Sequence, residues 1–255
     1  MKKTISTIIT LAVIAFAAFG QQLDPESDFA IELIDNDRSV RITGYNGNNT
    51  AVRIPQRIRN LPVTEIGREA FSEKGITSVT IPNGVTSIGV LAFAINQLTS
   101  VTIPNSVTSI RTFAFARNSL SSVIIPNSVT SIGGGAFARN SLTNVTIPNS
   151  VTLIHSHAFS NNQLASVTIP DSVAMIGNHA FSDNRLTNVT IPNRVASIGE
   201  AAFYDNQLTS ITIPDSVTSI GEFAFAENRL TSVSIPRNTR VDPQSFDEDV
   251  TVTRR

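Results

Sequence analysis

Three histidines are the residues of this 255-residue chain whose type and spacing could do chemistry. His157 and His179 are 22 residues apart, and His155 lies two residues before His157. Neutral imidazole nitrogens bind zinc, copper and nickel, so histidines from neighbouring segments could share a metal ion. No cysteine is present and no carboxylate stands at a fixed spacing from them, so three polar residues on a solvated turn are the simpler interpretation. His155, His157 and His179 are weak metal candidates, and no metal is predicted.

The sequence shows no recognisable arrangement of catalytic side chains. A nucleophile needs a base within hydrogen-bond reach and a group that orients this base. Ser and Thr are abundant, but they recur at regular intervals and none stands out beside an acid and a histidine. Gly133-Gly134-Gly135 is followed by no Lys and no G-x-G-x-x-G pattern, so it does not indicate a phosphate site. We therefore expect a non-enzymatic protein without a cofactor.

Charge and composition limit the kinds of partner that we expect for this protein. The chain has 19 basic and 20 acidic residues, a net charge of −1, with no basic stripe, so nucleic acid is an unfavourable partner. Without cysteine there are no disulfides, and stability must come from packing.

The first 20 residues have the pattern of a secretory signal peptide. Lys2 and Lys3 precede the uncharged, mostly apolar run 5–19, and small residues lead to Gly20 before a polar start. A membrane anchor is the weaker interpretation, because a span needs about 20 apolar residues. We expect a secreted or cell-surface protein, with the periplasm as an alternative, and no membrane insertion after cleavage.

The rest of the chain is dominated by a repeat. Ile-Pro recurs every 22 residues from Ile81-Pro82 to Ile235-Pro236, and columns of Leu, Val, Ala-Phe and Asn keep the same period. Such a period with fixed apolar columns predicts a solenoid, in which each unit buries its apolar face against its neighbours. The phenylalanine column consists of Phe71, Phe93, Phe115, Phe137, Phe159, Phe181, Phe203 and Phe225.

Within a unit, Leu98–Ile103 alternates apolar and polar residues and predicts a strand that ends at Pro104. A second extended segment should carry Val107 and Ile110, followed by a short helical turn at Ala114–Phe115. The asparagine column suits tight turns and bonds to nearby backbone, so it is interpreted as structural.

These units resemble the BspA-like class of bacterial leucine-rich repeats. The resemblance lies in the pattern L-x-x-V-x-I-P-x-S-V-x-x-I-G-x-x-A-F-x-x-N over residues 54–246, with Asn where such repeats often carry Cys. It implies an α/β, β-rich leucine-rich-repeat solenoid, capped at both ends. It also implies a surface or secreted protein of the kind that binds host matrix proteins or other bacteria.

The expected organisation is a signal peptide at 1–20, an N-terminal β cap at 21–53, the solenoid at 54–236 and a degenerate C-terminal cap at 237–255. In the N-terminal cap, Phe29–Leu33 and Ser39–Thr43 read as strands around a turn at 35–37. In the C-terminal cap, Val241 and Phe246 take the places of Ile220 and Phe225 one residue early.

Two surfaces compete for function. The outward strand positions are mostly Ser and Thr, a uniform hydroxyl ladder that could bind ice, although Ile124 and several Asn break it. The units differ mainly just before Ala and two residues after Phe. Packing against neighbouring units is one account of these columns and a protein-binding patch is the other. The partner-binding candidates are Leu91, Ile95, Phe113, Arg117, Arg139 and Phe223.

We expect an exported protein that binds another protein, a host matrix or cell-surface protein, and so mediates adhesion. A periplasmic scaffold is the alternative function, and ice binding is a minor one.

Overall fold

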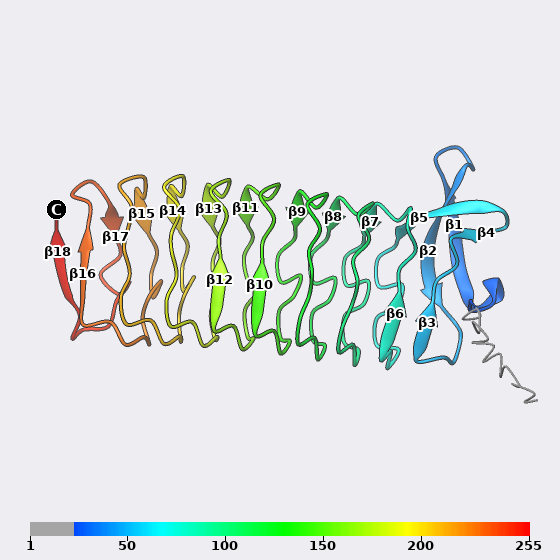
Figure 1. Cartoon of the computed structure of the whole chain (residues 1–255), viewed down its shortest axis with the longest axis horizontal. Helices are drawn as coiled ribbons and strands as arrows, with labels where there is room; N and C mark the ends of the chain where they lie inside the picture. Colours follow the sequence, from blue (N-terminus) through cyan, green and yellow to red (C-terminus); the bar gives the residue numbers. More distant parts are fainter. Residues whose placement is uncertain (1–22) are drawn as a thin grey trace, which may run out of the picture.

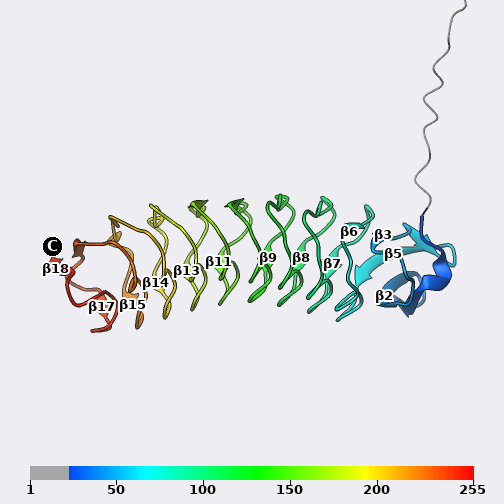
Figure 2. The ribbon, with the colours of Figure 1, turned by 90° about the horizontal axis from the view of Figure 1, so that it is seen from below.

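The computed structural model describes residues 23–255, so the expected signal peptide at 1–20 lies outside the described residues. The chain forms one elongated array of stacked turns, with the N-terminal strands at one end and the C-terminus at the other (Figure 1). Seen from below, successive units follow each other side by side along the whole array (Figure 2). The solenoid predicted from the period of 22 residues is therefore confirmed.

Each unit contributes two extended segments. The segment around the central Val forms β3 (Ala51–Arg53), β6 (Ser78–Thr80), β10 (Asn144–Thr146), β12 (Ser166–Thr168), β16 (Ser232–Ile235) and β18 (Thr251–Arg254). The Ser-Ile segment forms β7 (Ser87–Ile88), β8 (Ser109–Ile110), β9 (Ser131–Ile132), β11 (Leu153–Ile154), β13 (Met175–Ile176), β14 (Ser197–Ile198), β15 (Ser219–Ile220) and β17 (Arg240–Val241).

The Ser-Ile segment carries the more continuous pairing. Its strands lie in two sheets. The first has the order β1-β2-β5-β7-β8-β9 and begins with β1 (Phe29–Ile34), β2 (Ser39–Tyr45) and β5 (Leu61–Ile66) of the N-terminal end, and the second has the order β11-β13-β14-β15-β17. The strands of the Val segment pair only as β3-β6, β10-β12 and β16-β18. Isolated bridges join Thr80 to Thr102 and Thr102 to Ile124. Pro104 and its equivalents lack a backbone donor, which limits the ladder of the Val segment to a few residues.

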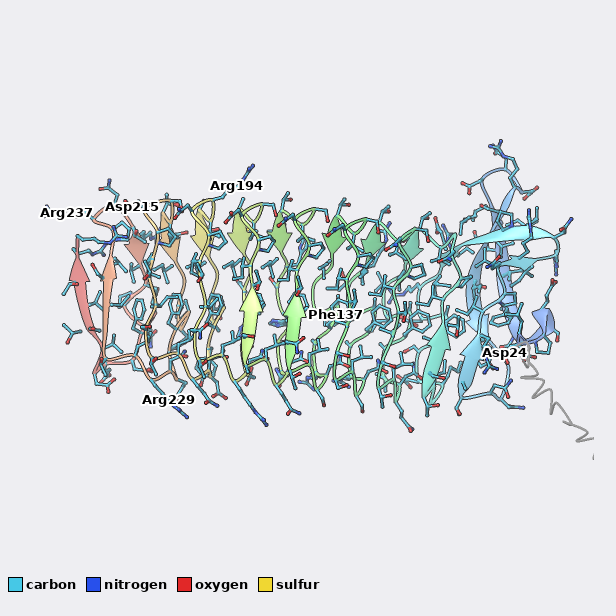
Figure 3. All side chains as sticks on the ribbon, viewed as in Figure 1. Asp24, Phe137, Arg194, Asp215, Arg229 and Arg237 are labelled. Carbon is cyan, nitrogen blue, oxygen red and sulfur yellow. The ribbon has the colours of Figure 1, made fainter. Side chains whose placement is uncertain are left out.

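The phenylalanine column is the centre of the core. From Phe71 to Phe225 the rings stack at centroid distances of 5.0–5.7 Å with interplanar angles of 4–14°. All eight are fully buried, and Phe137 lies among the side chains between the two extended segments (Figure 3). Burial of one such ring stabilises the fold by about 1.5–3 kcal/mol.

The asparagine column is a second continuous structural element. Asn162 Nδ2 donates to the carbonyls of Phe137 (3.0 Å) and Phe159 (3.1 Å), and Asn162 Oδ1 accepts the Leu142 N–H at 3.0 Å. The equivalent bonds recur at Asn96, Asn118, Asn140, Asn184, Asn206 and Asn228. Each amide therefore ties its own unit to the preceding one, as expected of a structural residue.

The helical part of a unit is reduced to a turn. Ala114 N–H donates to Arg111 O at 3.1 Å, but Phe113 has φ 56°, which interrupts a right-handed helical path. The one helix among residues 23–255 is the 3-10 helix η1 (Glu26–Asp28).

The N-terminal end is covered by a hairpin. Strands β1 (Phe29–Ile34) and β2 (Ser39–Tyr45) pair antiparallel around a turn in which Asp35, Asn36 and Asp37 all have positive φ. Strand β2 pairs in parallel with β5 (Leu61–Ile66), and Tyr45 extends the stack of rings at 5.6 Å from Phe71. The five extra residues of the first unit form β4 (Arg57–Ile58) and its tight turn to β5.

At the C-terminal end the pattern continues with a shift of one residue. Val241 pairs with Ile220 through β17 and β15, and the Phe246 ring stacks on Phe225 at 5.4 Å. Strand β18 then pairs with β16. Val241 and Phe246 therefore occupy the positions that the sequence pattern predicts for them.

Candidate protein-binding surface

The two variable columns share one backbone conformation, and together we call them the turn surface. The first column is the residue before each Ala: Glu69, Leu91, Phe113, Gly135, His157, His179, Ala201 and Phe223. The second is the residue two after each Phe: Glu73, Ile95, Arg117, Arg139, Asn161, Asp183, Asp205 and Glu227. All have φ between 49° and 63°, the left-handed region.

This conformation is imposed by contacts between units. Ile95 N–H donates to Ala116 O and Arg117 N–H donates to Ala138 O, both at 2.9 Å. In the first column, Phe113 N–H donates to Gly134 O at 2.9 Å. Glycine, Asn and Asp adopt the left-handed region readily, whereas a β-branched or bulky residue there is strained. Gly135 is the one glycine of the two columns. Every other position carries a side chain, and bulky or β-branched side chains such as Phe113 and Ile95 are strained there.

Several of the predicted binding residues lie at the surface. Ile95 is 40% exposed and Phe113 is 39% exposed, while Leu91 and Phe223 are half-buried. The Phe113 ring covers Gly135 of the next unit, where a Cβ atom would come within 2.2 Å of Phe113 Cε1. Packing between units therefore covers part of this ring, and the rest remains exposed.

Charge changes along the second column. Arg117 and Arg139 are exposed, and no ion pair joins them to an acidic side chain among residues 23–255. The C-terminal half is acidic and surrounds Tyr204, a residue that sequence reasoning did not select. Burial raises the Tyr204 pKa above its ordinary value, and the nearby carboxylates of Glu227, Asp205, Asp183 and Asp247 raise it further.

The two columns are close enough to form one surface. The His157 pKa is lowered, chiefly by burial and then by the neighbouring His179, while Asp183 of the second column opposes the shift. At the C-terminal end, Phe223 and Glu227 line the same hollow of about 630 Å³ together with Tyr204 and Phe246.

The structure brings two of the three histidines together. The rings of His157 and His179 lie 4.7 Å apart at 77°, and His179 Nε2 is 3.9 Å from Glu200 Oε1. His155 lies elsewhere, in the column of Gly133 and Gly177, at the unit where the Ser-Ile pairing is interrupted between β9 and β11. Within the described part of the chain, no group of three or more His, Cys, Asp or Glu side chains could hold a metal ion.

The strand face differs from a regular hydroxyl ladder. Its pairing is interrupted along the array, and Ile124 projects from it with 82% of its surface exposed. This irregularity does not suit a lattice-matching surface such as one that binds ice. Ile124 was visible in the sequence as the apolar residue in an outward Thr column, although it was not selected as a site. Of the helices in residues 23–255, none has the length and apolar character needed to span a membrane.

Comparisons with known proteins agree with this architecture. The family model described as "BspA type Leucine rich repeat region" matches residues 64–185 and 175–252, in six copies. A leucine-rich repeat protein from Bacteroides ovatus is similar in structure, with 26% identity, a TM-score of 0.69 and coverage of 89% of this chain and 70% of that chain. The leucine-rich repeat protein of T. pallidum has 27% identity, a TM-score of 0.60 and coverage of 82% and 91%. A search of curated proteins gave no match. The chain belongs to the BspA-type leucine-rich repeat family.

Proposed function

We propose that this protein is an exported, non-enzymatic interaction module that binds another protein through its turn surface, at or outside the cell surface. The observation that carries the proposal is the presence of large and charged side chains at left-handed positions of an otherwise uniform array. The partner would be a matrix or cell-surface protein, and the signal-peptide pattern of residues 1–20 supports its encounter outside the cytoplasm. Residues 21–53 and 237–255 would serve as the caps of the array.

The energetics support a selected role for these side chains. A non-glycine residue in a sparsely populated backbone region costs on the order of 1–3 kcal/mol. Asn or Gly would relieve that strain, yet the first units carry Leu91, Ile95 and Phe113. Because Ile95 and Phe113 are about two-fifths exposed, the burial of their apolar surface offsets only part of this strain. Exposed apolar groups beside Arg117 form the kind of mixed patch that is typical of protein interfaces.

We expect the double variant Phe113→Ala/Arg117→Ala to lose at least about tenfold in binding, because aromatic and Arg residues carry much of the energy of protein interfaces. The measurement is retention of the purified protein on immobilised matrix proteins and on bacterial surface extracts. A double variant of the strand face, Thr102→Ala/Ile124→Ala, is the matched control and should bind like the parent. Equal losses in the two variants, or no loss in the first, would contradict the proposal.

A further inference from the structure

Four charges at the centre of the second column change sign about Asn161. Towards the N-terminus the second column continues with Arg139 and then Arg117, and towards the C-terminus it continues with Asp183 and then Asp205. All four side chains are exposed. The steps between ring centroids that flank Phe159 are 5.7 and 5.6 Å on one side and 5.7 and 5.4 Å on the other. The units are therefore spaced almost equally on the two sides of the Asn161 unit.

Side-chain size follows the same symmetry. Counting two units from the Asn161 unit, Phe113 corresponds to Ala201 in the first column. Three units away, Leu91 corresponds to Phe223, so that two half-buried apolar side chains are matched. In the first column a large residue therefore corresponds to a small, buried one and an apolar residue to an apolar one, whereas Ile95 of the second column corresponds to Glu227.

We infer that the turn surface binds a second copy of this chain, antiparallel to the first, about a two-fold axis that crosses the array at the unit of Asn161. In this arrangement each column faces the same column of the other copy. Arg139 faces Asp183, Arg117 faces Asp205 and Phe113 faces Ala201. Two-fold symmetry forms every such contact twice. The inference goes beyond the proposed function, since it assigns a second copy of this chain to the same surface.

Other alignments of two copies are less favourable. A parallel arrangement in register sets the first column against the second, so that Arg117 meets Phe113 and Arg139 meets Gly135, and no Arg meets an acidic residue. An antiparallel arrangement shifted by one unit in one direction sets Arg139 against Asn161 and brings Phe113 opposite His179. Shifted in the other direction, it sets Arg139 against Asp205 and Arg117 against Glu227, with Phe113 opposite the equally large Phe223. Like-charge contacts and unfilled pairs discriminate strongly between binding modes. Antiparallel alignment therefore pairs opposite charges, and the register about Asn161 also places Phe113 opposite the small Ala201.

The test is sedimentation equilibrium of the purified protein and of two charge-reversed variants. Arg117→Asp/Arg139→Asp makes these four facing positions all acidic, and Asp183→Arg/Asp205→Arg makes them all basic. The parent should form dimers that weaken as salt is raised, because screening reduces these ion pairs. Each variant alone should dissociate at least about tenfold more readily than the parent, and an equimolar mixture should form a heterodimer.

The control variant is Arg194→Asp. Arg194 projects from the edge of the array opposite to that of Arg229 (Figure 3), and Arg229 follows Glu227 of the second column by two residues. Dimerisation of this variant should equal that of the parent. A monomeric parent, or variants that dimerise alone as well as the parent does, would overturn the inference. The proposed function is judged separately: a monomer whose retention on matrix or surface extracts still depends on Phe113 and Arg117 retains that function without self-association. If the protein forms the dimer but is not retained on matrix or surface extracts, the inference stands and binding to a different protein is rejected.

Discussion

Replacing Phe137 by Ala is expected to lower the free energy of unfolding by about 3–5 kcal/mol. The ring is fully buried and lies between Phe115 at 5.6 Å and Phe159 at 5.7 Å, nearly parallel to both. Removing it leaves a cavity between two rings that belong to different units. The backbone bonds between these units fix their spacing, so the cavity cannot close.

Thermal and urea denaturation of the Phe137→Ala variant measure this loss. The matched control is Phe113→Ala, the same chemical change at a ring that is 39% exposed. The control should lose much less stability, because less apolar surface returns to water and a left-handed backbone accepts Ala with less strain than Phe. If the Phe137→Ala variant and the parent had the same melting temperature, the phenylalanine stack would not be a main source of stability.

The second large effect is expected for Asn162→Asp, which should destabilise the protein by roughly 3 kcal/mol or more. A carboxylate keeps an acceptor for the Leu142 N–H but has no donor for the carbonyls of Phe137 and Phe159. It would place a charge at a position that is 8% exposed, against carbonyl oxygens. Buried charge without a partner is among the most destabilising changes in a protein.

The adjacent residue gives the control for this change. Asn161 is exposed and left-handed, and the same column carries Asp183 and Asp205. Asn161→Asp loses one exposed hydrogen bond, from Asn161 Nδ2 to Asp183 Oδ2 at 3.3 Å, so it should lower stability in urea denaturation by no more than about 1 kcal/mol. If the two variants denature at the same urea concentration, the asparagine column does not hold the units together.

The period of the sequence was sufficient to predict most of the architecture. Fixed columns at 22-residue spacing specify which side chains stack, so Phe225 and Phe246 could be matched although the last unit is one residue short. The spacing also anticipated the approach of His157 and His179. These features depend on apolar and aromatic residues whose burial leaves a direct pattern in the sequence.

The left-handed turns could not be predicted in the same way. Glycine or Asn signals positive φ, but Ile95, Phe113 and Arg117 give no such sign, and a short helical turn was the natural interpretation of Ala114–Phe115. Backbone bonds to the following unit determine the conformation. Likewise, the discontinuous pairing of the Val segment depends on the distances between units, and these distances cannot be predicted from residue types.

The most direct test of the turn surface combines stability and binding in the variant Ile95→Asn. Asn adopts the left-handed region more readily than a β-branched residue, so melting should stay unchanged or rise by up to about 3 °C. Retention on matrix proteins and surface extracts should fall, whereas Ile124→Asn, at an Ile that is 82% exposed on the strand face, should bind like the parent. A stable Ile95→Asn variant with weakened binding is the predicted result. Full binding by Ile95→Asn, or an equal loss in Ile124→Asn, would contradict a functional role for the turn surface.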